Sequence, residues 1–214
     1  MEETDNDDFA RLRSRVAPHR VYPDFLSDEE HAALLGWAIA EIERYVPSRV
    51  RGGGERPDVR RSLSLRDLGA TASALKARLR ALAPRMLADL RMTPFEVAGI
   101  ELELISHGDG DYFHRHIDTM TGGEASADRA ITAIYYFHRP PRAFGGGALR
   151  LYGLLGGDHP PFADIEPAQN TLLAFPAWAP HEVTPVSCPS GARADSRFSV
   201  NCWLYRRRTG APSD

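Results

Sequence analysis

The spacing of apolar residues changes near Val97, and this change constrains the fold more than any other feature of the chain. Before it, apolar residues recur at intervals of three and four, which is the helical period. After it, residues 100–104 alternate between apolar and acidic side chains, as a half-buried strand requires. Further short apolar runs follow, separated by Gly, Pro and Asp. Helices followed by antiparallel strands predict a mainly β sandwich or barrel with helices packed on one face.

Two helices are expected in the first part of the chain. Ser27 and Glu30 form a capping box at the start of the first helix. Its apolar face has 3-and-4 spacing and comprises Leu34, Leu35, Ala38, Ile39 and Ile42. The second helix is expected over residues 72–90, where Pro84 should kink it or divide it in two. Residues 48–58 contain three consecutive glycines, but no strand precedes them and no helical pattern follows directly. We therefore expect a loop there and no phosphate cradle.

Four more strands are expected after the first one, over residues 131–137, 148–152, 171–175 and 198–205. Side chains in a strand alternate between its two faces. In the last strand, one face would therefore carry Arg197, Ser199, Asn201 and Trp203, and the other would carry Phe198, Val200, Cys202 and Leu204. The first of these faces is polar and the second is apolar.

The length of 214 residues fits one domain. We expect a flexible N-terminal tail over residues 1–15 and a single domain over 16–214, with helical support in 16–96 and a strand core in 97–206. Hydrophobic residues make up 43% of the chain, which is enough to bury a core.

The charge pattern excludes several classes of partner. A net charge of −3 gives no overall attraction for nucleic acid, and the basic run at residues 206–208 is interpreted as a solvated tail. No apolar run approaches the roughly 18 residues of a membrane span, and the N-terminus is acidic, so we expect a cytoplasmic protein without membrane contact. Cys188 and Cys202 are then expected to be reduced thiols.

His116 and Asp118 are the residues that first indicate chemistry. Side chains at i and i+2 of an extended strand point the same way, so an imidazole nitrogen and a carboxylate oxygen can bind one metal ion. His181 is the best candidate for a third ligand, because the long intervening chain allows strands to return beside the first pair. Two histidines and one carboxylate leave positions open on Fe(II), an arrangement used by enzymes that activate oxygen, whereas zinc prefers a closed site or a single open position.

Arg197 follows on a predicted strand, where an arginine can hold a carboxylate through two charge-assisted hydrogen bonds. With this context, the sequence resembles the 2-oxoglutarate and Fe(II) oxygenases of the prolyl 4-hydroxylase-like group. The resemblance covers roughly residues 97–206 and, more loosely, 21–45. It is carried, in chain order, by His116-x-Asp118, the strand at 134–137, the turn at 146–152, the segment Pro180-His181-Glu182-Val183 and the Arg197 strand.

The resemblance implies a double-stranded β-helix, or jelly roll, with supporting N-terminal helices. It implies that His116, Asp118 and His181 are the catalytic iron ligands and that Arg197 binds the distal carboxylate of 2-oxoglutarate. Tyr136 would add a hydroxyl group to that carboxylate. His107 stands where relatives often have a tyrosine and would donate a hydrogen bond to the co-substrate, and Asn201 would contribute from the Arg197 face.

The implied activity is that of an oxidoreductase, a hydroxylase acting on an unactivated C–H bond. Its co-substrates would be 2-oxoglutarate and O2, its co-products succinate and CO2, and ascorbate is expected to support turnover in vitro. The substrate would be a prolyl residue of a protein or peptide, a free amino acid or another small molecule, and the residues do not choose among these. They also leave the oligomeric state open.

Substrate contacts are expected from two segments. Residues 46–61 carry Arg49, Arg51 and Arg56, which would favour an anionic substrate, and residues 119–129 follow the His-x-Asp pair with the flexible composition of a lid. Residues 187–196 form an insertion relative to many relatives and are expected to reach over the active site.

Two other functional classes remain open at this point. One is a metal-dependent isomerase or a dioxygenase that uses no 2-oxoglutarate. Arg197 distinguishes the favoured class from these enzymes, because it would bind the 2-oxoglutarate carboxylate. The other is a non-catalytic metal-binding or sensor jelly-roll module.

Overall fold

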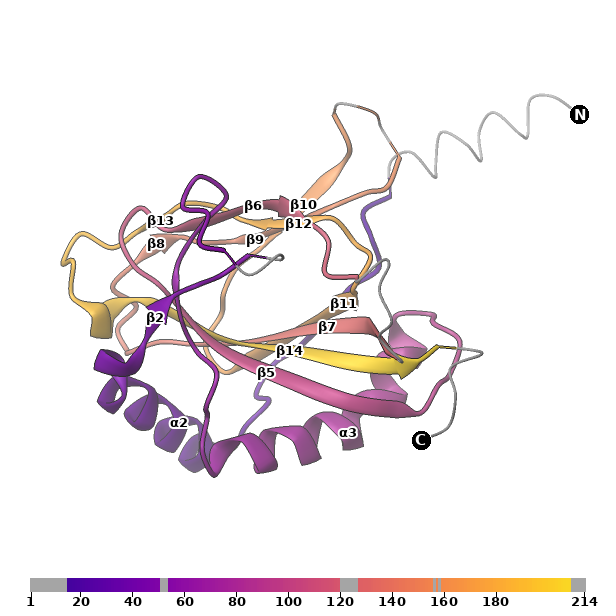
Figure 1. Ribbon diagram of the computed structural model, residues 1–214, viewed down its shortest axis with the longest axis horizontal. Coiled ribbons are helices and arrows are strands. Elements are labelled where there is room, and N and C mark those ends of the chain that lie inside the picture. Colours follow the sequence, from indigo (N-terminus) through magenta and orange to yellow (C-terminus); the bar gives the residue numbers. More distant parts are fainter. Residues whose placement is uncertain (1–14, 51–53, 120–126, 156, 158, 209–214) are drawn as a thin grey trace, which may run out of the picture.

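The computed structural model describes residues 15–50, 54–119, 127–155, 157 and 159–208. These residues form 14 strands and two α-helices, so the fold is mainly β. Two antiparallel sheets face each other, with β5, β7 and β14 in one layer and β6, β9, β10 and β12 in the other (Figure 1). Both helices lie on the outer side of the first layer. The arrangement confirms the expected jelly roll with helical support.

The larger sheet has seven strands, in the order β1 (Arg20–Tyr22), β11 (Thr171–Pro176), β7 (Ala127–Phe137), β14 (Arg197–Arg207), β5 (Val97–His107), β4 (Leu63–Leu65) and β2 (Val46–Pro47). The smaller sheet has five, in the order β10 (Phe162–Ile165), β9 (Leu149–Tyr152), β12 (His181–Val183), β6 (Tyr112–His116) and β3 (Arg60–Arg61). A separate pair joins β13 (Val186–Ser187) to β8 (Gly145–Gly146). The described residues also include two 3-10 turns, η1 (Ile42–Arg44) and η2 (Arg193–Asp195).

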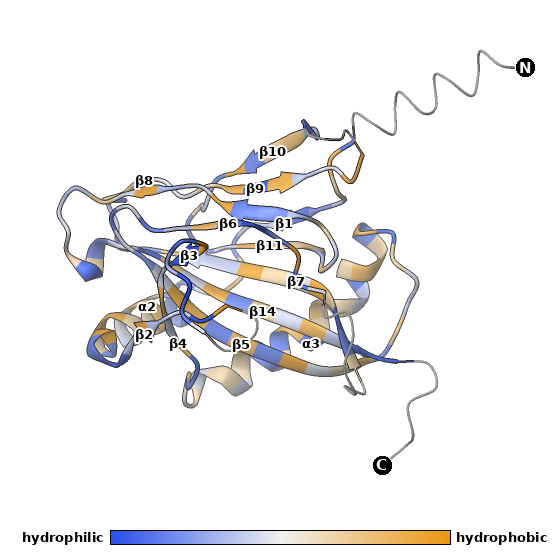
Figure 2. Ribbon diagram, turned by 45° about the horizontal axis from the view of Figure 1, so that its top comes forward, coloured by the Kyte–Doolittle hydropathy of each residue, from blue (hydrophilic) through white to orange (hydrophobic). Residues whose placement is uncertain are grey.

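The two faces of β14 have the opposite environments that the sequence predicts. Its apolar face packs into the main hydrophobic core, which lies between the larger sheet and the helices and includes Phe198, Val200, Cys202 and Leu204. Its polar face lines a cavity between the two sheets and comprises Arg197, Ser199, Asn201 and Trp203. Orange and blue bands alternate along β5 and β14 for the same reason (Figure 2).

The first helix, α2 (Asp28–Ala40), begins at the predicted capping box. The Ser27 hydroxyl accepts a hydrogen bond from the Glu30 amide, and the Glu30 carboxylate accepts one from the Ser27 amide. Leu34 and Ala38 are buried in the main core. Ile42 packs there too, but from η1, because α2 ends before it.

The second helix, α3 (Thr71–Asp89), continues through Pro84, so the predicted division in two is wrong. Proline removes one helical hydrogen bond and costs roughly 3 kcal/mol in a helix interior. Here Pro84 is exposed, and buried residues on both sides of it, Leu79 and Met86 among them, hold both halves against the sheet. Packing therefore offsets the lost bond.

The predicted long strands are confirmed, but sequence reasoning missed most of the short ones. Strands of two to four residues, such as β1, β3 and β12, are too short to show a period. Because β1 to β4 precede Val97 and join both sheets, the strand core begins earlier than residue 97. Arg206 and Arg207 belong to β14 and Arg208 pairs with Asp128, so this basic run is not a solvated tail.

Two other expectations concern the N-terminal tail and membrane-spanning segments. Apart from Arg15, the expected N-terminal tail lies outside them. Within the described part of the chain, no helix has the length and apolar character needed to cross a membrane.

Candidate active site

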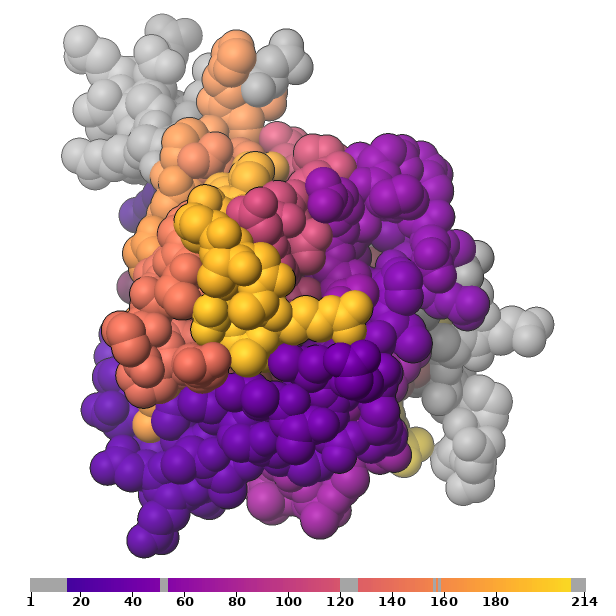
Figure 3. All heavy atoms as spheres, turned by 90° about the vertical axis from the view of Figure 1, so that its left-hand side faces the viewer, coloured from indigo at the N-terminus to yellow at the C-terminus, as the bar shows by residue number. Residues whose placement is uncertain are grey.

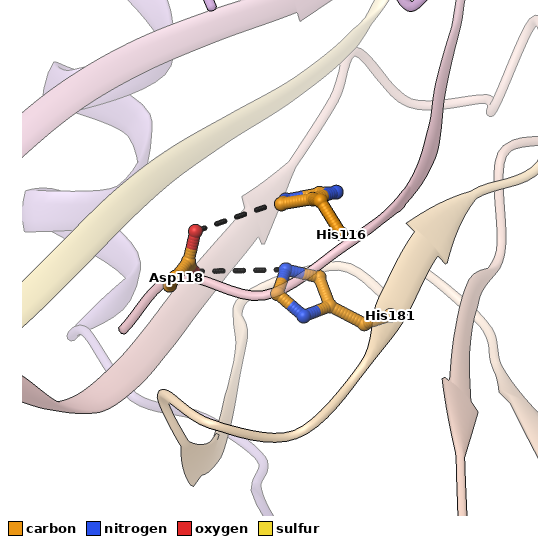
Figure 4. Close-up of side chains that lie close together, drawn as sticks. All are labelled: His116, Asp118 and His181. Atoms are coloured by element: carbon orange, nitrogen blue, oxygen red, sulfur yellow. Dashed lines mark ion pairs between the residues drawn. The ribbon is translucent and has the colours of Figure 1, made fainter. Parts of the chain in front are cut away.

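The three predicted metal ligands converge where the paired strands β6 and β12 of the smaller sheet end and begin (Figure 4). His116 is the last residue of β6, and His181 is the first residue of β12 and lies opposite it in the antiparallel pair. The candidate ligand atoms of His116, Asp118 and His181 all lie within 4.8 Å of one another. Asp118 Oδ1 is 3.7 Å from His116 Nε2, and Asp118 Oδ2 is 3.6 Å from His181 Nε2.

Asp118 lies beyond the end of β6, so the two residues do not share an extended strand as predicted. A turn achieves the same convergence, because the amides of Asp118 and Thr119 both donate to the carbonyl of Ala177, at 2.9 and 3.0 Å. The loop before β12 therefore fixes the position of the carboxylate.

Each ligand is oriented by a neighbouring group. His116 Nδ1 lies 2.8 Å from the His114 carbonyl, and His181 Nδ1 lies 2.8 Å from the Ala179 carbonyl. A carbonyl accepts only from a protonated Nδ1, so each ring would present its Nε2 to a metal ion. The Oδ2 atom of Asp118 accepts hydrogen bonds from Thr132 Oγ1 at 2.7 Å and Trp203 Nε1 at 2.9 Å, and these hold the carboxylate in place.

The protonation states suit metal binding. Burial, aided by nearby His181, lowers the pKa of His116 to about 3, so its ring is neutral at pH 7. Burial alone would raise the pKa of Asp118, but His181, His116 and the two hydrogen bonds outweigh it and lower that pKa. Metal ligands must be deprotonated at the donor atom. A neutral imidazole beside an ionised carboxylate is part of the donor set that non-haem Fe(II) oxygenases use.

A cavity of about 330 Å³ extends from these ligands between the sheets, and Arg197 lies in its wall. Arg197 is 1% exposed, and its Nε donates to the Gly147 carbonyl at 2.7 Å. Its Nη1 is 3.3 Å from His107 Nδ1, and its guanidinium carbon is 4.9 Å from the centre of the Tyr136 ring. The structure therefore brings together Arg197, Tyr136 and His107 as predicted.

Three buried polar atoms around Arg197 have no hydrogen-bond partner among the described residues: Arg197 Nη2, the Tyr136 hydroxyl and His107 Nε2. Burial, with a contribution from Arg197, holds the pKa of His107 well below its usual range, so this ring is neutral. Its Nδ1 faces an arginine donor, which leaves the proton on Nε2. Burial raises the pKa of Tyr136 to about 12, so its hydroxyl keeps its proton. All three atoms are thus donors.

Buried donors without acceptors are costly, so this set calls for an anionic ligand with several acceptor oxygens. A carboxylate meets the requirement, and an arginine can bind it strongly. The residues present thus fit both Fe(II) and the distal carboxylate of 2-oxoglutarate.

Gly147 is part of this site, although the sequence singled it out only as a turn residue. Its φ of +69° is in the left-handed region, and a Cβ atom there would lie 2.7 Å from Arg197 Cδ and 2.9 Å from Val186 Cγ2. Only glycine lets this turn approach Arg197 closely enough to accept its hydrogen bond.

The remaining predicted residues have different environments. Asn201 lines the cavity, and its Oδ1 accepts from Ser199 Oγ at 3.5 Å, so its role toward the co-substrate stays a prediction. Arg49 lines the cavity, whereas exposed Arg56 pairs with Asp58. Arg51 and most of the expected lid, residues 120–126, lie outside the described residues.

The predicted insertion, residues 187–196, does not line the cavity. It runs over another face of the molecule, where it appears in yellow beside the salmon segment after β7 (Figure 3). Asp195 lies 3.2 Å from Arg139, and the Cys188 amide donates to Asp109 at 2.7 Å. These contacts hold the insertion against Arg139 and the turn at residues 108–111, so the expectation that it reaches over the active site is wrong.

Comparisons with known proteins agree with this chemistry. Residues 102–205 match the family model of the 2OG-Fe(II) oxygenase superfamily. An uncharacterized PKHD-type hydroxylase from Synechocystis sp. is 38% identical over 189 residues, which make up 86% of this chain and 62% of that protein. The chain therefore spans less than two thirds of this relative.

Two solved structures share the fold. A prolyl-4-hydroxylase from Pseudomonas putida superposes with a TM-score of 0.64 at 21% identity, covering 95% of this chain and 97% of that one. A prolyl hydroxylase from Trichoplax adhaerens, in complex with a hypoxia inducible factor peptide fragment, gives a TM-score of 0.65 at 16% identity, covering 96% and 92%. From the family match and the ligand set together, residues 102–205 belong to the 2OG-Fe(II) oxygenase superfamily, and the fold is that of the two prolyl hydroxylases.

Proposed function

We propose that this protein is an Fe(II)- and 2-oxoglutarate-dependent dioxygenase that hydroxylates an unactivated C–H bond and releases succinate and CO2. The observation that carries the proposal is the set of three partnerless donors around Arg197. Two of the residues that carry them, Arg197 and His107, line the same cavity as the metal ligands, and the Tyr136 ring lies against the Arg197 guanidinium. A metal-binding module that used no 2-oxoglutarate would have no need of these buried donors.

His116, Asp118 and His181 would hold the iron, which when bound supplies the oxygen-activating chemistry. With three protein donors, the site would leave positions on the metal open for other ligands. Thr132 and Trp203 restrict rotation of the Asp118 carboxylate and so position the anionic ligand.

Arg197, Tyr136 and His107 would bind the distal carboxylate of 2-oxoglutarate and direct its other end toward the metal. Asn201, on the same face of β14, would assist. The cavity lining also includes the apolar side chains of Ile134, Leu149 and Val183. These side chains exclude water from the space that the co-substrate would occupy.

The substrate would be a prolyl residue or an amino acid. The fold neighbours include a prolyl hydroxylase crystallised with a peptide, which supports a peptide or a small molecule as the substrate. Residues 46–61 and 119–129 would contact it, because Arg49, Val50 and Thr119 line the cavity at its approach to the metal.

The test is formation of succinate by purified protein supplied with Fe(II), ascorbate, O2 and 2-oxoglutarate, followed by NMR. Mass spectrometry of a substrate library from the same reactions would detect a gain of one oxygen atom. Asp118→Ala should abolish succinate formation, whereas Asp164→Asn, which breaks a surface pair with Arg150, should not. If wild-type protein binds metal but forms no succinate with any library member, a non-catalytic module is the better description.

A further inference from the structure

A second group of arginines lies in the wall of the same cavity, apart from Arg197. Arg60, in β3, is 7% exposed and lines the cavity. Its Nε donates to Ser62 Oγ at 2.9 Å, and its Nη1 donates to the Arg49 carbonyl at 3.4 Å. Its Nη2 lies 3.9 Å from the carboxylate of buried Glu103.

The negative charge of Glu103 does not fully neutralise the Arg60 guanidinium, because Glu103 also pairs with a second arginine. Arg66 Nε lies 3.2 Å from Glu103 Oε1, so two guanidinium groups share one carboxylate. Within the described residues, the Arg49 guanidinium in the same wall has no hydrogen bond or ion pair. Arg129, by contrast, is balanced by Glu101 at 2.7 Å.

The wall therefore carries excess positive charge. Asp118, the other carboxylate in the cavity lining, belongs to the metal site. A buried guanidinium without full compensation is unfavourable unless an anion occupies the cavity beside it.

The position of Arg60 relates this charge to the metal site. Its guanidinium carbon lies 4.8 Å from the centre of the Phe113 ring, and Phe113 stacks on His116 with centroids 3.6 Å apart. The excess charge is thus one aromatic ring away from a metal ligand. The cavity of about 330 Å³ must also hold the co-substrate, which leaves room for a small group.

We propose that Arg60, with Arg66 and Arg49, binds a carboxylate of the substrate and places a nearby C–H bond at the metal. The substrate would then be a carboxylate-bearing molecule, with a free amino acid as the source that the small cavity favours. This inference rests on the proposed hydroxylase function, and it separates the substrate carboxylate at Arg60 from the 2-oxoglutarate carboxylate at Arg197.

The test measures binding without turnover, using protein loaded with Zn(II) and saturating 2-oxoglutarate. Saturation-transfer NMR would screen the common amino acids against their carboxamides, which lack the carboxylate. N-acetylaspartyl amide and N-acetylglutamyl amide would be included because they keep only a side-chain carboxylate. Calorimetry would then give affinities for the members that bind.

We expect at least one acid to bind at least ~10-fold more tightly than its amide, because a charge-assisted hydrogen bond is typically worth about that factor. Binding of a free amino acid would locate the carboxylate in a small molecule, and binding of a capped acid would locate it in an acidic side chain. Arg60→Gln should remove most of the preference while 2-oxoglutarate affinity stays at the wild-type level.

Arg66→Gln keeps the inference testable if Arg60→Gln does not fold. Arg66 is largely exposed, and its loss leaves Arg60 and Glu103 as a neutral pair, so the preference should fall here too. Arg44→Gln is the matched control, since Arg44 is another exposed arginine that pairs with carboxylates, those of Glu41 and Asp67, and it lies outside the cavity lining.

Equal binding of acids and amides, a preference that survives both substitutions, or binding of 2-oxoglutarate alone would each overturn the carboxylate subsite. Failure of wild-type protein to bind 2-oxoglutarate would instead refute the proposed function.

Discussion

Replacing Gly147 with alanine should weaken 2-oxoglutarate binding without disturbing the metal ligands. The new Cβ atom would lie 2.7 Å from Arg197 Cδ and 2.9 Å from Val186 Cγ2, both well inside van der Waals contact. The φ of +69° adds about 1 kcal/mol of backbone strain for a residue with a Cβ. We expect the turn to move away from Arg197 and the bond from Arg197 Nε to the Gly147 carbonyl to lengthen or break.

The size of the effect follows from that bond. A hydrogen bond to a charged group contributes about 1.5–3 kcal/mol, which corresponds to a factor of roughly 10 to 100 in affinity. The dissociation constant for 2-oxoglutarate should rise by a factor in this range. Metal affinity should stay unchanged, because the ligands lie outside the turn at Gly147. His116 is in β6, Asp118 follows β6 and His181 is in β12.

The assay is anaerobic calorimetry of 2-oxoglutarate binding to metal-loaded protein, with thermal unfolding to confirm that the variant folds. Gly145→Ala is the matched control: it lies two residues away, has no positive φ, and its added Cβ would meet nothing within 4 Å. Wild-type 2-oxoglutarate affinity in Gly147→Ala, or an equal loss in Gly145→Ala, would refute the reasoning.

Three further predictions test the rest of the site. Asp118→Ala should remove most Fe(II) binding in anaerobic titration, because it deletes the only anionic ligand; undiminished affinity would show that the ligand assignment is wrong. Tyr136→Phe should raise the KM for 2-oxoglutarate about 5-fold, since one hydrogen bond contributes about 1 kcal/mol, and an unchanged KM would remove Tyr136 from the co-substrate site. Shortening residues 121–127 should impair hydroxylation of the true substrate while Fe(II) and 2-oxoglutarate affinities stay near wild type; full turnover with an unchanged substrate KM would place recognition elsewhere.

Much of the site could be predicted because its residues have chemical signatures. Histidine and aspartate at short spacing indicate a metal, and alternation along residues 197–204 separates the cavity face from the core face before any contact is known. The jelly roll followed from the change of period near Val97 together with the family resemblance.

The contacts that sequence reasoning missed all depend on three-dimensional register. Nothing in the sequence shows that Thr132 and Trp203 donate to Asp118, because the three residues come from different segments. Gly147 has the sequence context of an ordinary turn glycine until Arg197 is placed beside it. Arg60 lay within a segment expected to contact substrate, but its burial depends on the pairing of β3 with β6. Because β3 has only two residues, the sequence shows no detectable strand period there.

Calorimetry of 2-oxoglutarate binding is the sharpest test of the co-substrate site around Arg197. Anaerobic protein loaded with Fe(II) should bind 2-oxoglutarate, and Arg197→Ala should weaken that binding at least ~10-fold, because a charge-assisted bidentate pair is worth more than ~1.5 kcal/mol. Fe(II) affinity should be the same in both proteins. Equal 2-oxoglutarate affinity in the two proteins, or no binding to the wild type, would contradict the account.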